Sequence, residues 1–207
     1  MISSALLAVL VVAPIKFHAP LEEQTNAYKL RERISTSAFG SVEMTGVEKR
    51  HIGAPQKGRR PVDITFEVQI TGKNYKSSAS EKWAQEELLG LREPDHGFLD
   101  DQDKLTESDG VSVDAYPIFP TAAIEVGGGW QFTISGQRCL YTLEKVDGNK
   151  ATITTESSMK SGRGSLKRKG SWVVEISSGK LLSWDLHSEV TYPGGQKETV
   201  DSDGELK

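Results

Sequence analysis

The chain has 207 residues, of which 36% are hydrophobic and 26% are charged, which is typical of a globular protein with one sizeable core or two small ones. Its formal net charge of −4 gives no reason to expect general binding of nucleic acid. The single cysteine, Cys139, excludes an internal disulfide and a zinc site of several thiolates, and we interpret it as a small buried apolar residue.

An apolar run opens the chain, from Ala5 to Pro14. It has the length of a signal-peptide core and is too short to cross a bilayer as a helix. We therefore predict a signal peptide over residues 1–19, cleaved after Ala13 or Ala19, and an extracytoplasmic location, secreted or periplasmic. No lysine or arginine precedes the run, so a buried first strand is the alternative interpretation.

Apolar and polar residues alternate in the segments that follow. Residues 27–39 predict a half-buried strand, and residues 51–61, rich in glycine and proline, predict a loop or a wide hairpin end. The clearest strand of this half covers residues 62–70. Its inward positions hold Val62, Ile64, Phe66, Val68 and Ile70.

One segment breaks the alternation, from Ser78 to Gly90. Ser78 and Glu81 have the spacing of a capping box, and Gly90 stands where a C-terminal cap would fall. We predict a short helix that packs over one end or one face of the sheet. A loop with frayed helical turns is the alternative.

Residues 92–110 are acidic and predict an irregular loop. The carboxylates of Asp95, Asp100, Asp101 and Asp103 are of the type that calcium prefers, but their spacing does not match the calcium loop between two helices. We interpret the loop as solvated. The sequence predicts no metal site and no cofactor.

The second half begins with a proline-led approach, three glycines and a tryptophan, over Phe119–Phe132. No helix follows Gly127-Gly128-Gly129 as phosphate binding would require, so we predict a tight turn that enters a strand. Short strands follow, separated by turns at 147–150 and 177–180 and by a polar connection over 157–170. These strands cover residues 140–146, 151–155, 171–176 and 181–192, and a short last strand or tail ends the chain.

These elements predict a mainly β fold. Hairpins at this spacing form an antiparallel meander, and we expect a curved sheet, a half-barrel or a barrel with one short helix. Residues 20–207 would form a single β-rich domain, with a loop–helix insertion around residues 73–115.

Three stretches of the second half occur together: Pro120–Trp130, the Tyr141–Ile153 hairpin and the Gly170–Leu181 paired strand. With them, the region Phe119–Thr191 resembles a group of uncharacterised secreted bacterial β-rich proteins, in which a proline-led approach runs into a Val-Gly-x-x-Trp turn. The resemblance implies a fold and an exported location, and it implies nothing about a reaction.

No known catalytic motif is present in the sequence, and we predict no catalytic residue. The histidines His18, His51, His96 and His187 are too dispersed to propose a metal site. A dyad of Cys139 and His187 is compatible with the sequence, because catalytic partners meet in space, but no pattern supports it.

A basic cluster, Lys160, Arg163, Lys167, Arg168 and Lys169, lies in the polar connection of the second half. It could dock an anionic surface such as lipid headgroups or an acidic polymer. The alternative is an ordinary solvated loop.

We therefore predict an exported, non-enzymatic binding or structural module that holds an apolar or lipid-like ligand in a curved sheet, with the helix over residues 78–90 as a lid. The first alternative is a hydrolase of the cell envelope that uses the acidic loop 95–103. The second is an inert scaffold partner with a filled core. We expect no nucleic-acid partner and no transmembrane span.

Overall fold

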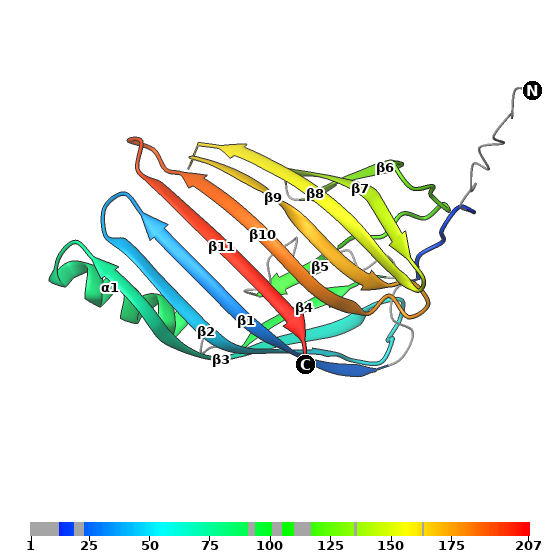
Figure 1. Cartoon of the computed structure of the whole chain (residues 1–207), viewed down its shortest axis with the longest axis horizontal. Helices are drawn as coiled ribbons and strands as arrows, with labels where there is room; N and C mark the ends of the chain where they lie inside the picture. The colour runs from blue at the N-terminus through cyan, green and yellow to red at the C-terminus, as the bar shows by residue number, and fades with distance from the viewer. Residues whose placement is uncertain are drawn as a thin grey trace, which may run out of the picture.

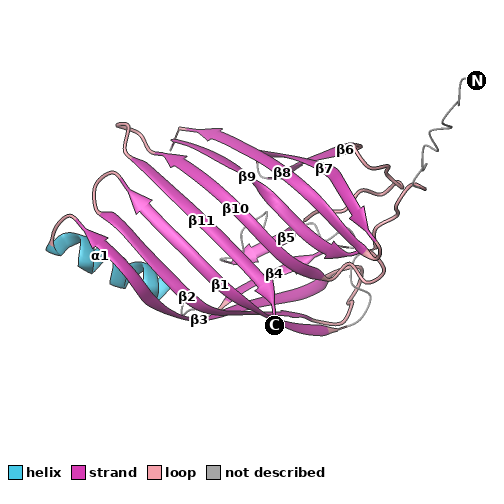
Figure 2. Ribbon diagram, in the orientation of Figure 1, coloured by secondary structure: helices cyan, strands magenta, loops and turns pink. Residues whose placement is uncertain are grey.

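A computed structural model describes residues 13–18, 23–90, 94–100, 105–109, 117–134, 136–162 and 164–207. Within these ranges, eleven strands form one antiparallel sheet, accompanied by one helix (Figures 1 and 2). The first half contains β1 (Gln24–Thr36), β2 (Gly40–Ile52), β3 (Arg60–Tyr75), α1 (Ser78–Gly90), β4 (Asp95–Leu99) and β5 (Leu105–Asp109). The second half contains β6 (Gly129–Ile134), β7 (Gln137–Asp147), β8 (Lys150–Ser161), β9 (Gly164–Glu175), β10 (Leu181–Thr191) and β11 (Lys197–Leu206).

Two meanders meet in the middle of the sheet. The strand order is β5-β4-β3-β2-β1-β11-β10-β9-β8-β7-β6, so the chain begins at the centre, builds to one edge, restarts at the opposite edge and returns. The first and last strands therefore lie side by side, blue beside red in Figure 1. The edge strands β5 and β6 do not pair with each other, so the predicted antiparallel curved sheet is confirmed and the closed barrel among its alternatives is wrong.

The two faces of the sheet differ in chemistry because side chains alternate along every strand. One face, which we call the inner face, carries the buried residues, and the opposite outer face is polar. On β3, for example, Val62 and Ile64 are fully buried on the inner face, while Asp63 and Glu67 point outward. The period-two pattern predicted this orientation correctly.

Segments from outside the strands cover part of the inner face. Phe17 stacks on Phe119, with ring centroids 5.2 Å apart and planes 3° from parallel. The indole Nε1 of Trp130 donates to the carbonyl oxygen of Ile118 at 2.7 Å, which fixes the segment ahead of β6 against the sheet. Tyr141 on β7 stacks on Trp130 in turn, so this end of the core is largely aromatic.

The helix α1 covers another part of the same face, and its predicted bounds are confirmed. Ala84 and Leu88 pack on Ile34, Val42 and Met44 of β1 and β2. The capping residues differ from the prediction by one position. The backbone N–H of Ser77 donates to Ser80 Oγ at 3.2 Å, so Ser77 and Ser80 take the places expected for Ser78 and Glu81. In the described part of the chain, no helix is long and apolar enough to cross a membrane.

Two regions predicted to be irregular belong to the sheet, and the end of the chain, predicted as a short last strand or a tail, is a strand. The acidic loop contains β4 and β5, which pair with each other and attach to β3 through β4. The connection 157–170 is largely the extension of β8 and β9 into a long hairpin. The C-terminal tail is β11, a central strand held by β1 and β10 on its two sides. Pairing with neighbouring strands overrides weak local propensity in these segments.

Candidate functional site on the inner face

The inner face changes from aromatic to polar along the strands. Residues that lie opposite one another in the register form rows across β1, β11, β10, β9 and β8. The first row contains the aromatic residues and consists of Leu30, Gly204, Trp184, Trp172 and Ile153. The second row, two residues further along the strands, consists of Glu32, Ser202, Leu186, Gly170 and Thr155. The third row consists of Ile34, Val200, Ser188, Arg168 and Ser157. The face is therefore amphipathic on the scale of a single ligand.

A cavity of about 140 Å³ lies where the aromatic and polar rows meet. Six of its lining residues are aromatic or charged: Trp172, Trp184, Arg50, Arg168, Glu32 and Glu48. The other four are Leu186, Ser188, Val200 and Ser202. We call this cavity the inner pocket. Its volume suits a small polar group or a few water molecules, each of which occupies about 30 Å³ in the liquid.

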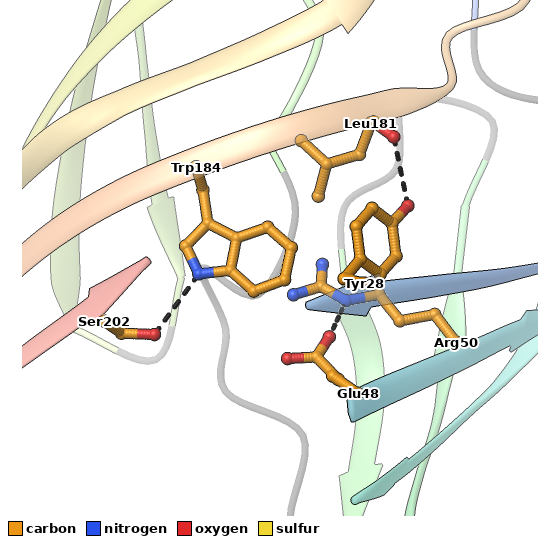
Figure 3. Close-up of polar contacts among 6 residues, drawn as sticks. All are labelled: Tyr28, Glu48, Arg50, Leu181, Trp184 and Ser202. Carbon is orange, nitrogen blue, oxygen red and sulfur yellow. Dashed lines mark hydrogen bonds and ion pairs between the residues drawn. The ribbon is translucent and has the colours of Figure 1, made fainter. Parts of the chain in front are cut away.

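A buried ion pair forms one wall of the inner pocket. Arg50 Nε donates to the carboxylate of Glu48, and the two side chains are only 5% and 6% exposed. The Arg50 guanidinium carbon lies 4.4 Å from the centroid of the Trp184 ring and 5.3 Å from that of Tyr28 (Figure 3). Such stacking is favourable for a desolvated cation, so the aromatic rings and Glu48 together hold this charge inside the fold.

The aromatic groups around this pair are fixed by their own hydrogen bonds. The hydroxyl of Tyr28 donates to the carbonyl oxygen of Leu181 at 3.1 Å, and Trp184 Nε1 donates to Ser202 Oγ at 3.2 Å (Figure 3). Burial raises the pKa of Tyr28 to about 12, so its hydroxyl stays protonated. Gly204 leaves room for the Trp184 ring, because a Cβ at that position would lie 2.2 Å from it.

The opposite wall comes from β9. Arg168 Nε donates to Ser188 Oγ at 2.7 Å, which orients the guanidinium. Trp172 is 1% exposed, and its Nε1–H has no acceptor among the described residues. Leaving a buried donor unsatisfied costs about 1–3 kcal/mol, so an oxygen atom supplied by a ligand or by water would be stabilised there.

Glu32 brings a second carboxyl group to the inner pocket. Its pKa is raised to about 7, chiefly by burial and also by the neighbouring carboxylates of Glu48 and Glu87, against the lowering effect of Arg168. A carboxyl that is half protonated near neutral pH can change the charge of the pocket with small changes in pH.

The stability of the protein is expected to depend on this group. Because the folded state binds the Glu32 proton more tightly than an unfolded chain, whose carboxyl titrates near 4.5, its contribution is complete below about pH 4.5 and is lost as the pH rises to about 7. The loss is on the order of 3 kcal/mol. The Glu32→Gln variant should therefore gain stability relative to the native chain between pH 5 and pH 8, as measured by urea unfolding.

The control for this experiment is Glu156→Gln, an exposed position on the outer face of β8. Its stability relative to the native chain should stay constant over the same pH range. A constant difference for Glu32→Gln as well would show that Glu32 titrates normally in the folded protein.

The outer face carries two adjoining open hollows over β7–β10, with volumes of about 340 and 580 Å³. Both include Lys169, Glu156 and His187. Asp201 holds His187 by a 2.6 Å contact to Nδ1, and this hydrogen bond raises the histidine pKa. The hollow of about 340 Å³ is lined by four cationic residues and two carboxylates, whereas the larger hollow has one lysine and two carboxylates.

The predicted basic cluster is divided between the two faces. Lys167 and Lys169 point outward from β9, whereas Arg168 points inward to the inner pocket. Arg163 lies outside the described residues. Lys167, Arg168 and Lys169 all line the hollow of about 340 Å³, and Arg168 also lines the inner pocket. Docking of an anionic surface by this cluster therefore stays a prediction.

The other sequence candidates do not converge. Asp95 begins β4 and Asp100 directly follows its last residue, about 16 Å away at 3.3 Å per residue, too far to act as a catalytic pair. Asp101 and Asp103 lie outside the described residues. Cys139 is buried on the inner face and His187 lies on the outer face, so the two cannot form a dyad. Within the described ranges, no group of three or more potential metal ligands occurs.

The residues of the inner pocket were not predicted as a site, although the sequence places two of its charged residues at inward positions of their strands. Glu32 shares its parity with Tyr28 and Leu30, and Arg168 shares its parity with Trp172, so both stand at inward positions. A charged residue at an inward position of a strand is uncommon and indicates a paired or functional group.

Comparison with known proteins finds a likeness of fold. No protein-family model matches the sequence, and no curated protein matches it. A solved structure that describes lipid–protein interactions in lipovitellin superimposes with a TM-score of 0.50 at 9% sequence identity. The match covers 91% of this chain and 25% of the lipovitellin chain, so the chain spans about a quarter of that protein. It shows a shared β-sheet architecture and assigns no family.

Proposed function

We propose that this protein is a non-enzymatic binding module that holds an amphipathic, lipid-like ligand against the inner face of its sheet. The observation that carries the proposal is the inner pocket, a small charged cavity directly beside a buried aromatic and aliphatic surface. A ligand with a polar head and an apolar chain matches both parts. The likeness of the fold to lipovitellin, whose structure concerns lipid–protein interactions, supports the same class of ligand.

The apolar chain of such a ligand would lie under α1. Val200 lines the inner pocket and also packs against the cluster that α1 covers, so the two regions are continuous. The helix contacts the sheet through few buried side chains, chiefly Ala84 and Leu88, and Leu89 beside them is 55% exposed. Lifting α1 would therefore expose Val42 and Met44 without breaking a strand pairing.

The first test is native mass spectrometry of the protein purified from its own cells, followed by titration with a fluorescent long-chain fatty acid. We expect a retained lipid and saturable binding of one ligand. A protein that retains no lipid and binds no fatty acid would contradict the proposal.

A matched pair of variants tests where the apolar chain of the ligand lies. Val200→Phe fills the boundary between the inner pocket and the α1 cluster and should weaken binding at least tenfold. Val173→Phe makes the same change on the outer face of β9 and should leave binding unchanged. Equal effects of the two variants would place the ligand elsewhere.

We also propose that the protein is exported, in line with its resemblance to secreted bacterial β-rich proteins. Residues 1–12 and 19 of the expected signal peptide lie outside the described residues. Cleavage after Ala13 would retain Phe17, whose ring is buried against Phe119, whereas cleavage after Ala19 would remove it. N-terminal sequencing of the protein from culture medium or periplasm distinguishes these sites, and an uncleaved cytoplasmic chain would contradict export.

A further inference from the structure

We infer that the inner pocket binds the carboxylate head of a long-chain fatty acid, with Arg168 and Trp172 as the groups that recognise it. This inference rests on the proposed function and deepens it, because it names the chemical class of the head. Three properties of the pocket support it: its hydrogen-bond donors, its charge and its size.

The donors lie on one strand, with a glycine between them and Leu186 of β10 beside that glycine. Trp172 offers a buried N–H that lacks an acceptor among the described residues, and Arg168 lines the same cavity four residues earlier. Gly170 is the inner-face residue between them, so no side chain of β9 separates the indole from the guanidinium. A carboxylate accepts hydrogen bonds through two oxygens and donates none, which complements a wall of donors.

The charged groups of the inner pocket include two arginines, which favour an anion. Glu48 pairs with Arg50, and the other charged side chains of the lining are Glu32 and Arg168. The groups that face Glu32 are Glu48 and Arg50 from β2, Arg168 from β9, Ser202 from β11 and Glu87 from α1. With Glu32 protonated, the lining holds two arginines and one ionised glutamate. An entering anion would also favour protonation of Glu32, so binding would be coupled to uptake of a proton.

The same arrangement disfavours a cationic head. A quaternary ammonium group binds best over the face of a tryptophan, but the Trp184 ring already carries Arg50 at 4.4 Å. The cavity of about 140 Å³ accommodates a carboxylate with the first atoms of its chain and excludes a large headgroup such as a sugar. The apolar chain would continue past Val200 toward α1.

The test uses the unaltered protein and ligands that share one chain: dodecanoate, dodecanol and dodecyl phosphate, titrated by calorimetry at pH 6.0, 7.0 and 8.5. We expect dodecanoate to bind at least tenfold more tightly than dodecanol. Its affinity should fall severalfold between pH 6.0 and pH 8.5, while that of dodecanol should not change. Equal affinities for the acid and the alcohol would overturn the inference and leave the proposed function intact.

The remaining outcomes are equally decisive. If dodecyl phosphate binds tightly and dodecanoate does not, the head is a phosphate and the inference is wrong. If none of the three ligands binds, the proposed function itself fails. Because these arms need no variant, they do not depend on the folding of an altered pocket.

Variants then assign the donors. Arg168→Met and Trp172→Phe should each weaken dodecanoate about tenfold or more and leave dodecanol within twofold, as expected for the loss of a charge-assisted hydrogen bond. Arg168→Lys keeps the charge, and its affinity for dodecanoate should lie between those of the native protein and Arg168→Met. Arg138→Met, on the outer face of β7, is the matched control and should have no effect. Glu32→Gln should abolish the pH dependence of dodecanoate binding. If neither Arg168→Met nor Trp172→Phe changes the affinity for dodecanoate, the assignment of the donors is wrong.

Discussion

Replacing Glu48 with alanine is expected to lower the free energy of unfolding by about 3–5 kcal/mol, as found when one partner of a buried ion pair is removed. The carboxylate of Glu48 is 6% exposed and pairs with Arg50, whose guanidinium is enclosed by the rings of Tyr28 and Trp184. Without Glu48, this buried cation loses the carboxylate with which it pairs. Urea unfolding followed by tryptophan fluorescence measures the loss, since Trp184 reports on the same site.

Two controls separate the buried charge from a general effect of losing a glutamate. Glu43 forms an exposed pair with Arg31 at 3.1 Å, and Glu43→Ala should cost no more than about 1 kcal/mol. The double variant Glu48→Leu/Arg50→Met removes both charges and should be much more stable than Glu48→Ala alone. A Glu48→Ala protein as stable as Glu43→Ala would mean that water reaches Arg50.

The regular elements could be predicted because their local patterns agree with the final structure. In β3 the apolar residues Val62 and Ile64 occupy alternate positions, and the alternation alone orients the strand. In α1 the helix-forming interior and Gly90 indicate the observed bounds, and the predicted N-terminal cap is displaced by only one residue. Such agreement between propensity, periodicity and capping requires no knowledge of distant partners.

A short last strand was one of two predictions for the end of the chain, but the central place of β11 in the sheet could not be predicted, because it depends on the neighbouring strands. The inward residues of β11 near Trp184 are small, Ser202 and Gly204, and Gly204 is required by the indole that lies over it. Read alone, Asp201–Glu205 resembles a solvated tail. Its place in the centre of the sheet follows from pairing with β1, which precedes it by about 170 residues and leaves no local signal.

The inner pocket was hidden for a related reason. Its polar lining comes from β1, β2, β9, β10 and β11, and the strand order, not sequence spacing, brings these residues together. Parity could have marked Glu32 and Arg168 as inward, but it could not show that they share one cavity. The curved sheet could therefore be foreseen, whereas the charged pocket required the register.

The second large effect concerns the segment ahead of the sheet. Phe17→Ala is expected to destabilise the protein by about 3–5 kcal/mol, the usual cost of removing a buried phenylalanine. The Phe17 ring is 4% exposed, stacks on Phe119 and lies 6.3 Å from the Trp130 ring. For a chain of this size the melting temperature should fall by roughly 6–20 °C, measured by circular dichroism.

The neighbouring positions test whether the segment itself is needed or only its aromatic ring. Lys16 is exposed, so Lys16→Ala should change stability by less than about 0.5 kcal/mol. Phe17→Leu keeps most of the apolar volume and should recover most of the loss. If Phe17→Ala melts at the native temperature, residues 13–18 do not belong to the core. Cleavage after Ala19 would then leave the fold intact, whereas a large loss requires that an exported form keep Phe17.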